Sequence, residues 1–466
     1  MKNTFKKIGA LVLAVMLIMS LSATAFATGA DLTGGEVGGF TTADTPTSQD
    51  KSINIAKELT VYNVDETTIN APSITYAYAV TAGEVGKSIT DATTDHANNT
   101  AVTVQTKAGI LIGLKVNGTT GATGSIAWAP TETVNASTSG AANLKYLTID
   151  FSDVVFGAAG VYRYVITETP HDGVASYAAT GVTETTSATN PHVRYLDVYV
   201  RPAPTGFTDG TAAADWDIYG YVCMLENEDI TDTGDTATTG AVKTNGFVAG
   251  SNDSTSYLAD SYYTYNVTVS KTVTNDNYAK ATHAFPFTVI FTNDTITQAV
   301  DISSTTTGTA GGFTDPASAA LSIDTTKGIL TLKDSSSVKY IGIPNGTQIE
   351  VYETNDVAGV TYQVTTLANI NGTAATTTDA AVIAGSTPVN AVAQNDPKAT
   401  HQSTKTSFTP TVNFDDDVVH TIAVDNNLQV ISPTGVTLRV APYVLMLGAG
   451  LFLILFTRRR KEENEA

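Results

Sequence analysis

The chain has 466 residues, a formal net charge of −20 and only 15% charged residues. A surface that binds the phosphates of nucleic acid is positively charged, whereas this chain is strongly negative, which argues against nucleic acid as a partner. The single cysteine, Cys223, allows no internal disulfide. The six histidines show no metal-ligand spacing, so neither a metal nor a cofactor is expected.

The N-terminus begins with lysines, continues with an apolar run and ends with small residues around Ala25 and Ala27. This pattern predicts a secretory signal peptide over residues 1–27, cleaved after Ala27. Residues 28–51 are rich in Gly, Thr and Asp and are predicted to form a flexible leader. The rest of the chain is therefore expected to be exported.

From Ser52 onward, short apolar-alternating runs are separated by Gly, Asn, Asp and Pro, a pattern typical of β-sandwich domains. A polar stretch, 226–256, divides the runs into two groups. Each group opens with a lysine-bearing strand and has a later strand ending in Glu-Thr, which indicates an internal duplication. We therefore predict an all-β chain with two tandem sandwich domains, 52–263 and 264–430. The clearest predicted strands are "INIAKELTV", "ITYAYAVTA", "GILIGLKV", "LKYLTIDF", "GVYRYVITET", "RYLDVYVRP", "DIYGYVCML", "SYYTYNVTVSKTV", "HAFPFTVIFT", "GILTLKD", "TQIEVYETN", "TYQVTTL" and "VVHTIAVDNNLQV".

The C-terminal segment, 431–466, differs from the rest of the chain. Its apolar run, 436–456, has about 20 residues, which is long enough to cross a bilayer as a helix. The basic residues Arg458 to Lys461 follow directly, and positive charge stays on the cytoplasmic side. We therefore expect the body of the chain outside the cell. The sequence "SPTG" stands just before the apolar run.

Five polar residues fall on otherwise apolar faces of predicted strands, because strand side chains alternate between two faces. The face of Lys57 is otherwise made of isoleucine, leucine and valine, and that of Lys271 of valine. Glu168, Glu353 and Asn426 lie on similar faces. All five side chains are therefore expected to point into the core.

A buried, unpaired Lys or Glu is costly, and its usual escape is a pKa shift toward the neutral form. A neutral lysine amine is a nucleophile and a neutral glutamic acid is a proton donor. Beside an Asn carboxamide, these groups can form an intramolecular isopeptide bond and release ammonia. The alternative is an ordinary buried Lys–Glu ion pair, and the faces alone leave both interpretations open.

The chain resembles the backbone (shaft) pilins of Gram-positive sortase-assembled pili, in particular the streptococcal type with two immunoglobulin-like (CnaB-type) domains. The resemblance covers nearly all of residues 52–460. It depends on the order and spacing of "AKELTV", "GVYRYVITET", "RYLDVYV", "TYNVTVSKTVTN", "FPFTV", "IPNGTQIEVYET", "IAVDNN" and "SPTGVTLRVAPY".

The resemblance implies one Lys–Asn isopeptide bond in each domain, promoted by a Glu. In the second domain these residues are Lys271, Asn426 and Glu353, and all three are present.

The first domain departs from this pattern, because its implied acceptor position holds Asp260 instead of Asn. Related domains join Lys to Asp with loss of water, and Asp260 shares a face with Leu258 and Tyr262. We therefore favour a bond from Lys57 to Asp260, with Glu168 as the proton shuttle. Asn252 remains the alternative acceptor, although its strand neighbours offer no apolar face.

The C-terminal motif Ser432-Pro433-Thr434-Gly435 resembles a sorting signal for a dedicated pilus sortase, which would cut after Thr434. In the family the freed Thr carboxyl is joined to a Lys of the next subunit. Lys243 in "GAVKTNGF" is the nearest match to that lysine, and Lys51 is the next candidate.

The resemblance thus implies a structural shaft subunit on the Gram-positive cell surface, held in the membrane only as a precursor. Its partners would be the sortase, identical subunits, minor pilins and a host ligand. It would not be an enzyme beyond one self-directed reaction per domain. A wall-anchored adhesin or minor pilin built from the same domains is the alternative function. A surface hydrolase is not supported, because the sequence shows no catalytic constellation.

Overall fold

The computed structural model describes most of the chain from residue 51 to residue 428. The described residues are 51–91, 102–170, 177–185, 192–202, 216–232, 238–239, 244–252, 255–314, 327–353, 361–378, 382–383, 406–408, 419–428, 446–447 and 449. The predicted signal peptide, Lys243 and the "SPTG" motif lie outside these residues. None of the helices in the described ranges combines the length and the apolar character needed to cross a membrane.

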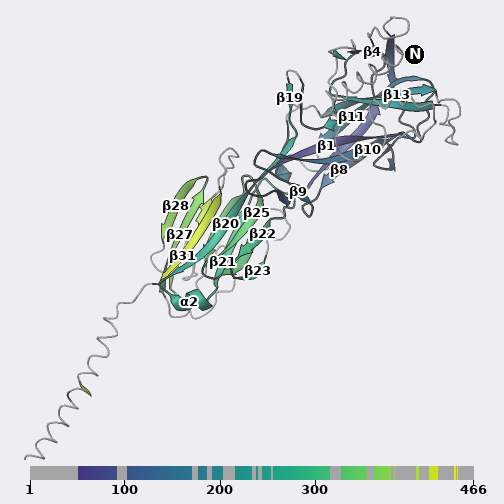
Figure 1. Ribbon diagram of the computed structural model, residues 1–466. Coiled ribbons are helices and arrows are strands. Elements are labelled where there is room, and N and C mark those ends of the chain that lie inside the picture. The colour runs from purple at the N-terminus through teal and green to yellow at the C-terminus, as the bar shows by residue number, and fades with distance from the viewer. Residues whose placement is uncertain are drawn as a thin grey trace, which may run out of the picture.

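The strands form two groups that lie end to end, with β20 running from one group into the other (Figure 1). The prediction of an all-β chain is confirmed. The elements of the N-terminal group are β1 (Ser52–Tyr62), β2 (Thr68–Asn70), β3 (Ile74–Ala82), β4 (Ser88–Asp91), β5 (Val102–Ala108), β6 (Lys115–Val116), β7 (Thr119–Thr120), β8 (Thr123–Trp128), β9 (Thr133–Asn135), β10 (Ala141–Asp150), β11 (Gly160–Pro170), the 3₁₀ helix η1 (Tyr177–Thr180), β12 (Val182–Thr183), β13 (Val193–Pro202), β14 (Trp216–Met224), β15 (Ile230–Asp232), β16 (Thr238–Thr239), β17 (Gly246–Phe247), β18 (Gly250–Asn252) and β19 (Thr255–Tyr257).

The short helix α2 lies at the end of the C-terminal group away from the N-terminal strands (Figure 1). Its elements are β20 (Asp260–Thr274), α2 (Asn277–Thr282), β21 (Phe285–Thr292), β22 (Ser303–Thr307), β23 (Ala310–Thr314), β24 (Lys327–Leu332), β25 (Ser336–Pro344), β26 (Gln348–Glu353), β27 (Thr361–Ile370), β28 (Thr373–Thr378), β29 (Val382–Ile383), β30 (Thr406–Phe408) and β31 (His420–Leu428).

One large sheet connects the two groups, in the order β28-β27-β31-β20-β1-β10-β6-β7. The N-terminal part of β20 pairs with β1, and its C-terminal part pairs with β25 and β31. A second sheet, with β13, β11 and β5 on its path and β3 beside β11, contributes to the N-terminal sandwich. A third sheet, in the order β23-β24-β21-β26-β30, contributes to the C-terminal sandwich.

Two groups of buried apolar side chains form the cores of the sandwiches. The N-terminal core draws on β1 and β10 from the large sheet and on β3, β11 and β13 from the second sheet. The C-terminal core draws on β20, β25 and β31 from the large sheet and on β21, β24 and β26 from the third sheet. Alternating apolar residues on each strand supply these cores, as the sequence pattern requires.

The strand β20 changes its buried face where it passes from one core to the other. Asp260 and Tyr262 are buried in its N-terminal part, whereas Val267, Val269 and Lys271 are buried further along. Even-numbered positions thus give way to odd-numbered ones. The change coincides with an irregularity in the pairing of β20 with β25 after Tyr265.

A reciprocal pair of buried asparagines holds the chain at this point. Asn63 Nδ2 donates to Asn266 Oδ1 at 3.0 Å, and Asn266 Nδ2 donates to Asn63 Oδ1 at 2.8 Å. Thr264 Oγ1 accepts a further bond from Asn63 Nδ2 at 2.8 Å. Buried polar groups need such partners, so the network fixes the end of β1 against β20.

Three details of the sequence analysis were wrong. Only Lys115–Val116 of the predicted strand "GILIGLKV" is paired, because the chain turns at Gly113, which has a φ of 87°. The polar stretch 226–256, expected to interrupt the strand pattern, contains the short strands β15 to β18 and the start of β19. Leu258, expected on the buried face of Asp260, is 57% exposed, because it lies between β19 and β20 and belongs to neither strand.

Candidate functional site

Two buried lysine sites are built in the same way. The first lysine site consists of Lys57, Glu168 and Asp260, and the second lysine site consists of Lys271, Glu353 and Asn426. All six side chains are buried, with exposed fractions of at most 3%.

The strand register places each predicted acceptor near its lysine. In the first site β1 and β20 are parallel, and Asp260 is paired with Leu59, two residues beyond Lys57. In the second site β20 and β31 are parallel, and Asn426 is paired with Val273, two residues beyond Lys271. Residues two apart share a face of a strand, so each acceptor side chain lies diagonally beside a lysine.

The glutamate of each site comes from the opposite sheet. Glu168 lies on β11 of the second sheet, and Glu353 lies on β26 of the third sheet. Each therefore reaches the lysine of the large sheet across the core.

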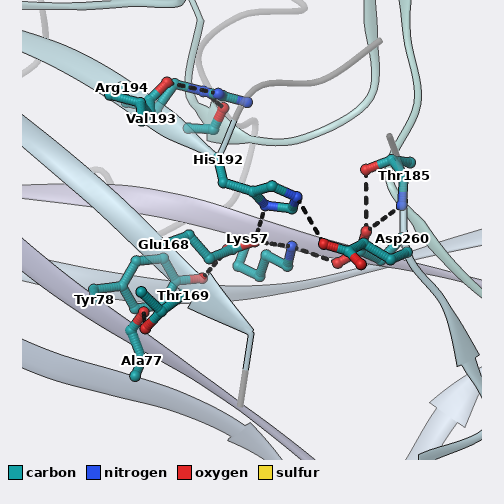
Figure 2. A network of polar contacts seen from close by, with 12 residues as sticks. Lys57, Ala77, Tyr78, Glu168, Thr169, Thr185, His192, Val193, Arg194 and Asp260 are labelled. Carbon is teal, nitrogen blue, oxygen red and sulfur yellow. Dashed lines mark hydrogen bonds and ion pairs between the residues drawn. The ribbon is translucent and has the colours of Figure 1, made fainter. Parts of the chain in front are cut away.

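In the first site Lys57 contacts both carboxylates (Figure 2). Its Nζ lies 2.9 Å from Glu168 Oε1 and 2.8 Å from Asp260 Oδ2. The same Nζ lies 4.1 Å from the centroid of the Tyr76 ring, which adds a cation–π contact. The ammonium group is thus surrounded by two acceptors and an aromatic face.

Two further side chains hold Glu168 in place. Tyr78 donates its hydroxyl to Glu168 Oε2 at 2.6 Å, and His192 Nδ1 lies 3.1 Å from Glu168 Oε1. Burial alone would raise the pKa of Glu168, but Lys57 and the hydrogen bonds from His192 and Tyr78 lower it to about 2. The hydrogen bond to Glu168 likewise raises the pKa of His192, against the effect of burial. Glu168 is therefore ionised in this arrangement.

The second carboxylate of the first site receives its own hydrogen bonds. Thr185 donates to Asp260 Oδ1 twice, from its backbone N–H at 2.9 Å and from its hydroxyl at 3.1 Å. Figure 2 shows Thr185 beside Asp260 and His192 beside Glu168. The two oxygens of Asp260 therefore have different partners, Lys57 on Oδ2 and Thr185 on Oδ1.

The second lysine site has a less charged character. Lys271 Nζ lies 3.0 Å from Glu353 Oε2, and Asn426 Nδ2 donates to Glu353 Oε1 at 2.5 Å. The Phe285 ring centroid is 4.5 Å from Lys271 Nζ. Burial lowers the pKa of Lys271 and raises the pKa of Glu353. Both shifts favour the neutral amine and the neutral acid.

The two acceptor candidates for Lys57, Asp260 and Asn252, lie in different sheets. Asp260 is in direct contact with Lys57 Nζ. Asn252 lies in β18, which pairs with β19 to form a separate two-stranded sheet. Lys243 and Thr434 lie outside the described residues.

Sequence reasoning missed three residues of the first site: Tyr78, Thr185 and His192. Tyr78 shares a strand face with Tyr76, a pattern that the sequence displays but that looks like ordinary core. Thr185 and His192 lie in connections beyond the strand pattern, and His192 was considered only as a metal ligand. Within the described residues, no group of three or more His, Cys, Asp or Glu side chains is arranged to hold a metal ion.

Comparison with known proteins gives one partial family match. Residues 265–387 match a model described as a domain of unknown function (DUF7601). No curated protein matches the chain.

Solved structures that match the chain include pilins and an adhesin. A major pilin (T3.2) of Streptococcus pyogenes matches at 17% identity over 81% of this chain and 100% of that chain, with a TM-score of 0.35. Another major pilin of this organism matches at 17% identity over 80% and 98% of the two chains, with a TM-score of 0.34. A Mobiluncus mulieris adhesin with intramolecular disulfide, isopeptide and ester cross-links matches at 11% identity over 81% and 98%, with a TM-score of 0.21.

Streptococcal major pilins, the group that the sequence resembles, are thus among the structural neighbours of the chain. The likeness is too distant to transfer residue roles from these proteins.

Proposed function

We propose that the chain is a structural subunit of a covalently assembled surface pilus, and that each lysine site forms an intramolecular isopeptide bond. The proposal rests on two contacts of Lys57 Nζ inside a buried site, with Glu168 Oε1 at 2.9 Å and with Asp260 Oδ2 at 2.8 Å. The repetition of the same strand register at Lys271 supports a common chemistry for both sites.

At the second lysine site the neutral amine of Lys271 attacks the side-chain carbonyl carbon of Asn426. Glu353, which contacts both residues, takes a proton from the attacking nitrogen and gives one to the leaving nitrogen. Ammonia departs and an amide remains. The raised pKa of Glu353 and the lowered pKa of Lys271, both caused by burial, support these protonation states.

At the first lysine site the acceptor is a carboxyl group, so water departs instead of ammonia. The alternative is that Lys57 stays in an ion pair with Glu168 and Asp260. Taking such charges out of water carries a penalty that their attraction often fails to offset. Forming the amide removes one positive and one negative charge from the buried site.

We further propose that the chain contains two tandem immunoglobulin-like, CnaB-type domains, 52–263 and 264–430. Residues 1–27 direct its export. A dedicated pilus sortase cleaves the Ser432-Pro433-Thr434-Gly435 motif and joins Thr434 to a lysine of the next subunit. This step is supported by the sequence motif, by the apolar run after it and by the basic residues that follow that run. The product is a cell-surface polymer, and only the precursor is held in the membrane.

The mass of the exported region Thr28–Thr434 tests the proposal. With both bonds formed, the intact mass should be lower than the sequence mass by one ammonia and one water. An unmodified mass would contradict the isopeptide proposal. Loss of two ammonias would instead assign the first-domain acceptor to an asparagine such as Asn252.

A further inference from the structure

The Oδ1 atoms of the two acceptor side chains, Asp260 and Asn426, differ in the hydrogen bonds that they receive. Asp260 Oδ1 accepts two hydrogen bonds from Thr185, one at 2.9 Å from the backbone N–H and one at 3.1 Å from the hydroxyl. Within the described residues, Asn426 Oδ1 is buried and accepts no hydrogen bond. Among the described residues, therefore, donors to the acceptor oxygen that does not face the lysine are present in the first site and not in the second.

We propose that Thr185 is an oxyanion hole for amide bond formation between Lys57 and Asp260. This inference rests on the proposed isopeptide bond and adds a catalytic residue to it. Preorganised donors stabilise charge that develops on an oxygen in the transition state, and they act most strongly where water is excluded. Asp260 is 1% exposed, so the site meets that condition.

The reaction can be balanced with the groups that are present. The Lys57 ammonium gives a proton to Glu168, and the resulting amine attacks the side-chain carboxyl carbon of Asp260. A carbon–nitrogen bond forms, and negative charge collects on Oδ1, where the two Thr185 donors lie. Glu168 gives the proton that it received from Lys57 to Oδ2. It then takes a second proton from the attacking nitrogen and gives that one to Oδ2 as well. The carbon–Oδ2 bond breaks, water leaves, Oδ1 becomes the amide oxygen, and Glu168 returns to its starting state.

The geometry assigns distinct roles to the two Asp260 oxygens before the reaction begins. Oδ2 lies 2.8 Å from Lys57 Nζ, the source of the protons that it must collect as it leaves. Oδ1 is bound only by neutral donors of Thr185 among the contacts of this site. Attack on a carboxylate adds negative charge to oxygens that are already charged. The transition state therefore needs such donors more than it does when a carboxamide is attacked. This difference explains why the Asn426 site can lack them.

The sheet fixes Thr185 at this position. The strand β12 pairs antiparallel with β20, with Val182 opposite Tyr262 and Thr183 opposite Ser261. Continuing this register brings the chain after Thr183 alongside Asp260, the first residue of β20. The pairing that ends at Thr183 thus places Thr185, two residues further along the chain, beside Asp260.

Timed peptide mapping of the full chain tests the inference. Samples are denatured at intervals after a short pulse of synthesis, and the fraction of Lys57 joined to Asp260 is measured by mass spectrometry. The Thr185→Val variant keeps the backbone N–H and the side-chain volume but loses the hydroxyl donor. We expect it to form the first bond about a hundredfold more slowly, the size of effect seen when one oxyanion-hole donor is removed. Thr185→Ser, which keeps the hydroxyl, should restore most of the rate.

The second lysine site is the control within the same molecule. The Lys271–Asn426 bond should form at the wild-type rate in all variants, which reports that the chain still folds. Should Thr185→Val also slow the second bond, Thr185→Ala, with its smaller side chain, replaces it in the comparison. A wild-type rate for the first bond in the hydroxyl-free variant that folds would overturn the oxyanion-hole inference while leaving the proposed function intact. Absence of the first bond from the wild-type chain would overturn both.

Discussion

Asp260 and Lys271 lie on one uninterrupted strand, β20, and each belongs to a different lysine site. Asp260 contacts Lys57 from the preceding part of the chain, and Lys271 contacts Glu353 from the following part. One strand therefore carries the proposed acceptor of the first site and the proposed nucleophile of the second. The two sites can be tested separately, because each has its own glutamate on its own facing sheet.

The first prediction concerns the glutamates. Glu168→Gln should block the Lys57–Asp260 bond, and Glu353→Gln should block the Lys271–Asn426 bond, because each removes the group that carries protons. Peptide mapping after complete digestion measures both bonds in each variant.

Each variant is the control for the other, since the untouched site should remain fully linked. By analogy with disulfides, the missing cross-link should lower the free energy of unfolding by roughly 2–4 kcal/mol. Recovery of the linked peptide at wild-type yield in a variant would remove its glutamate from the mechanism.

The second prediction concerns the leaving group. Asp260→Asn should still permit a bond to Lys57, but ammonia should depart in place of water, as at Asn426. The intact mass of this variant should therefore lie below its own sequence mass by two ammonias. In the matched variant Asp260→Ala only the second bond should form, with loss of one ammonia. Loss of a second molecule from the alanine variant would point to another acceptor.

The third prediction concerns pH and uses Asp260→Ala, in which Lys57 and Glu168 remain unlinked neighbours. Against the effect of burial, Lys57 and the hydrogen bonds of Glu168 lower its folded pKa from 4.5 to about 2. A lowered folded pKa contributes stability that is present above the unfolded pKa and is lost as pH falls through the folded value. The free energy of unfolding should therefore fall by roughly 3 kcal/mol between pH 5 and pH 2.

Urea unfolding across this range measures the effect. The double variant Asp260→Ala, Glu168→Gln serves as the control and should lack this component of the pH dependence. His192 does not produce the same signal, because its pKa is raised, chiefly by the hydrogen bond to Glu168. Its contribution is complete at low pH and is lost only as pH rises through its folded pKa. Equal slopes for the single and double variants would contradict the assignment to Glu168.

The fourth prediction concerns assembly. In cells with the matching sortase, Lys243→Ala should abolish the high-molecular-weight ladder, because the Thr434 carboxyl would lack its amine. Lys57 and Lys271 cannot serve, since both are buried within the sandwiches. Lys51→Ala is the matched control and should leave the ladder unchanged. Loss of the ladder in the Lys51 variant alone would transfer the role to that residue.

Strand patterns in the sequence located the lysine sites, because alternation alone placed Lys57, Lys271 and Glu168 on buried faces. Alternation is a local property and needs no knowledge of which strands are neighbours. It could not find Thr185, which reaches Asp260 through the pairing of β12 with β20 across a long sequence separation. Nor could it assign the charge difference between the sites, which depends on His192 and Tyr78 beside Glu168. An apolar run with a glycine fits both a strand and a turn, so the pattern around Gly113 predicted a strand where the chain turns.

The shared strand has a mechanical consequence once both bonds exist. Tension that enters a subunit at Lys243 and leaves it at Thr434 would bypass the loop closed by the proposed bond between Lys271 and Asn426, which are 155 positions apart. An unravelled chain lengthens by roughly 3.3–3.6 Å per residue, so this bond withholds on the order of 500 Å of extension. Between the two bonds the load passes only through the segment of β20 from Asp260 to Lys271, which is already extended. The segment between the two bonds would therefore transmit a pulling force with almost no change in its length.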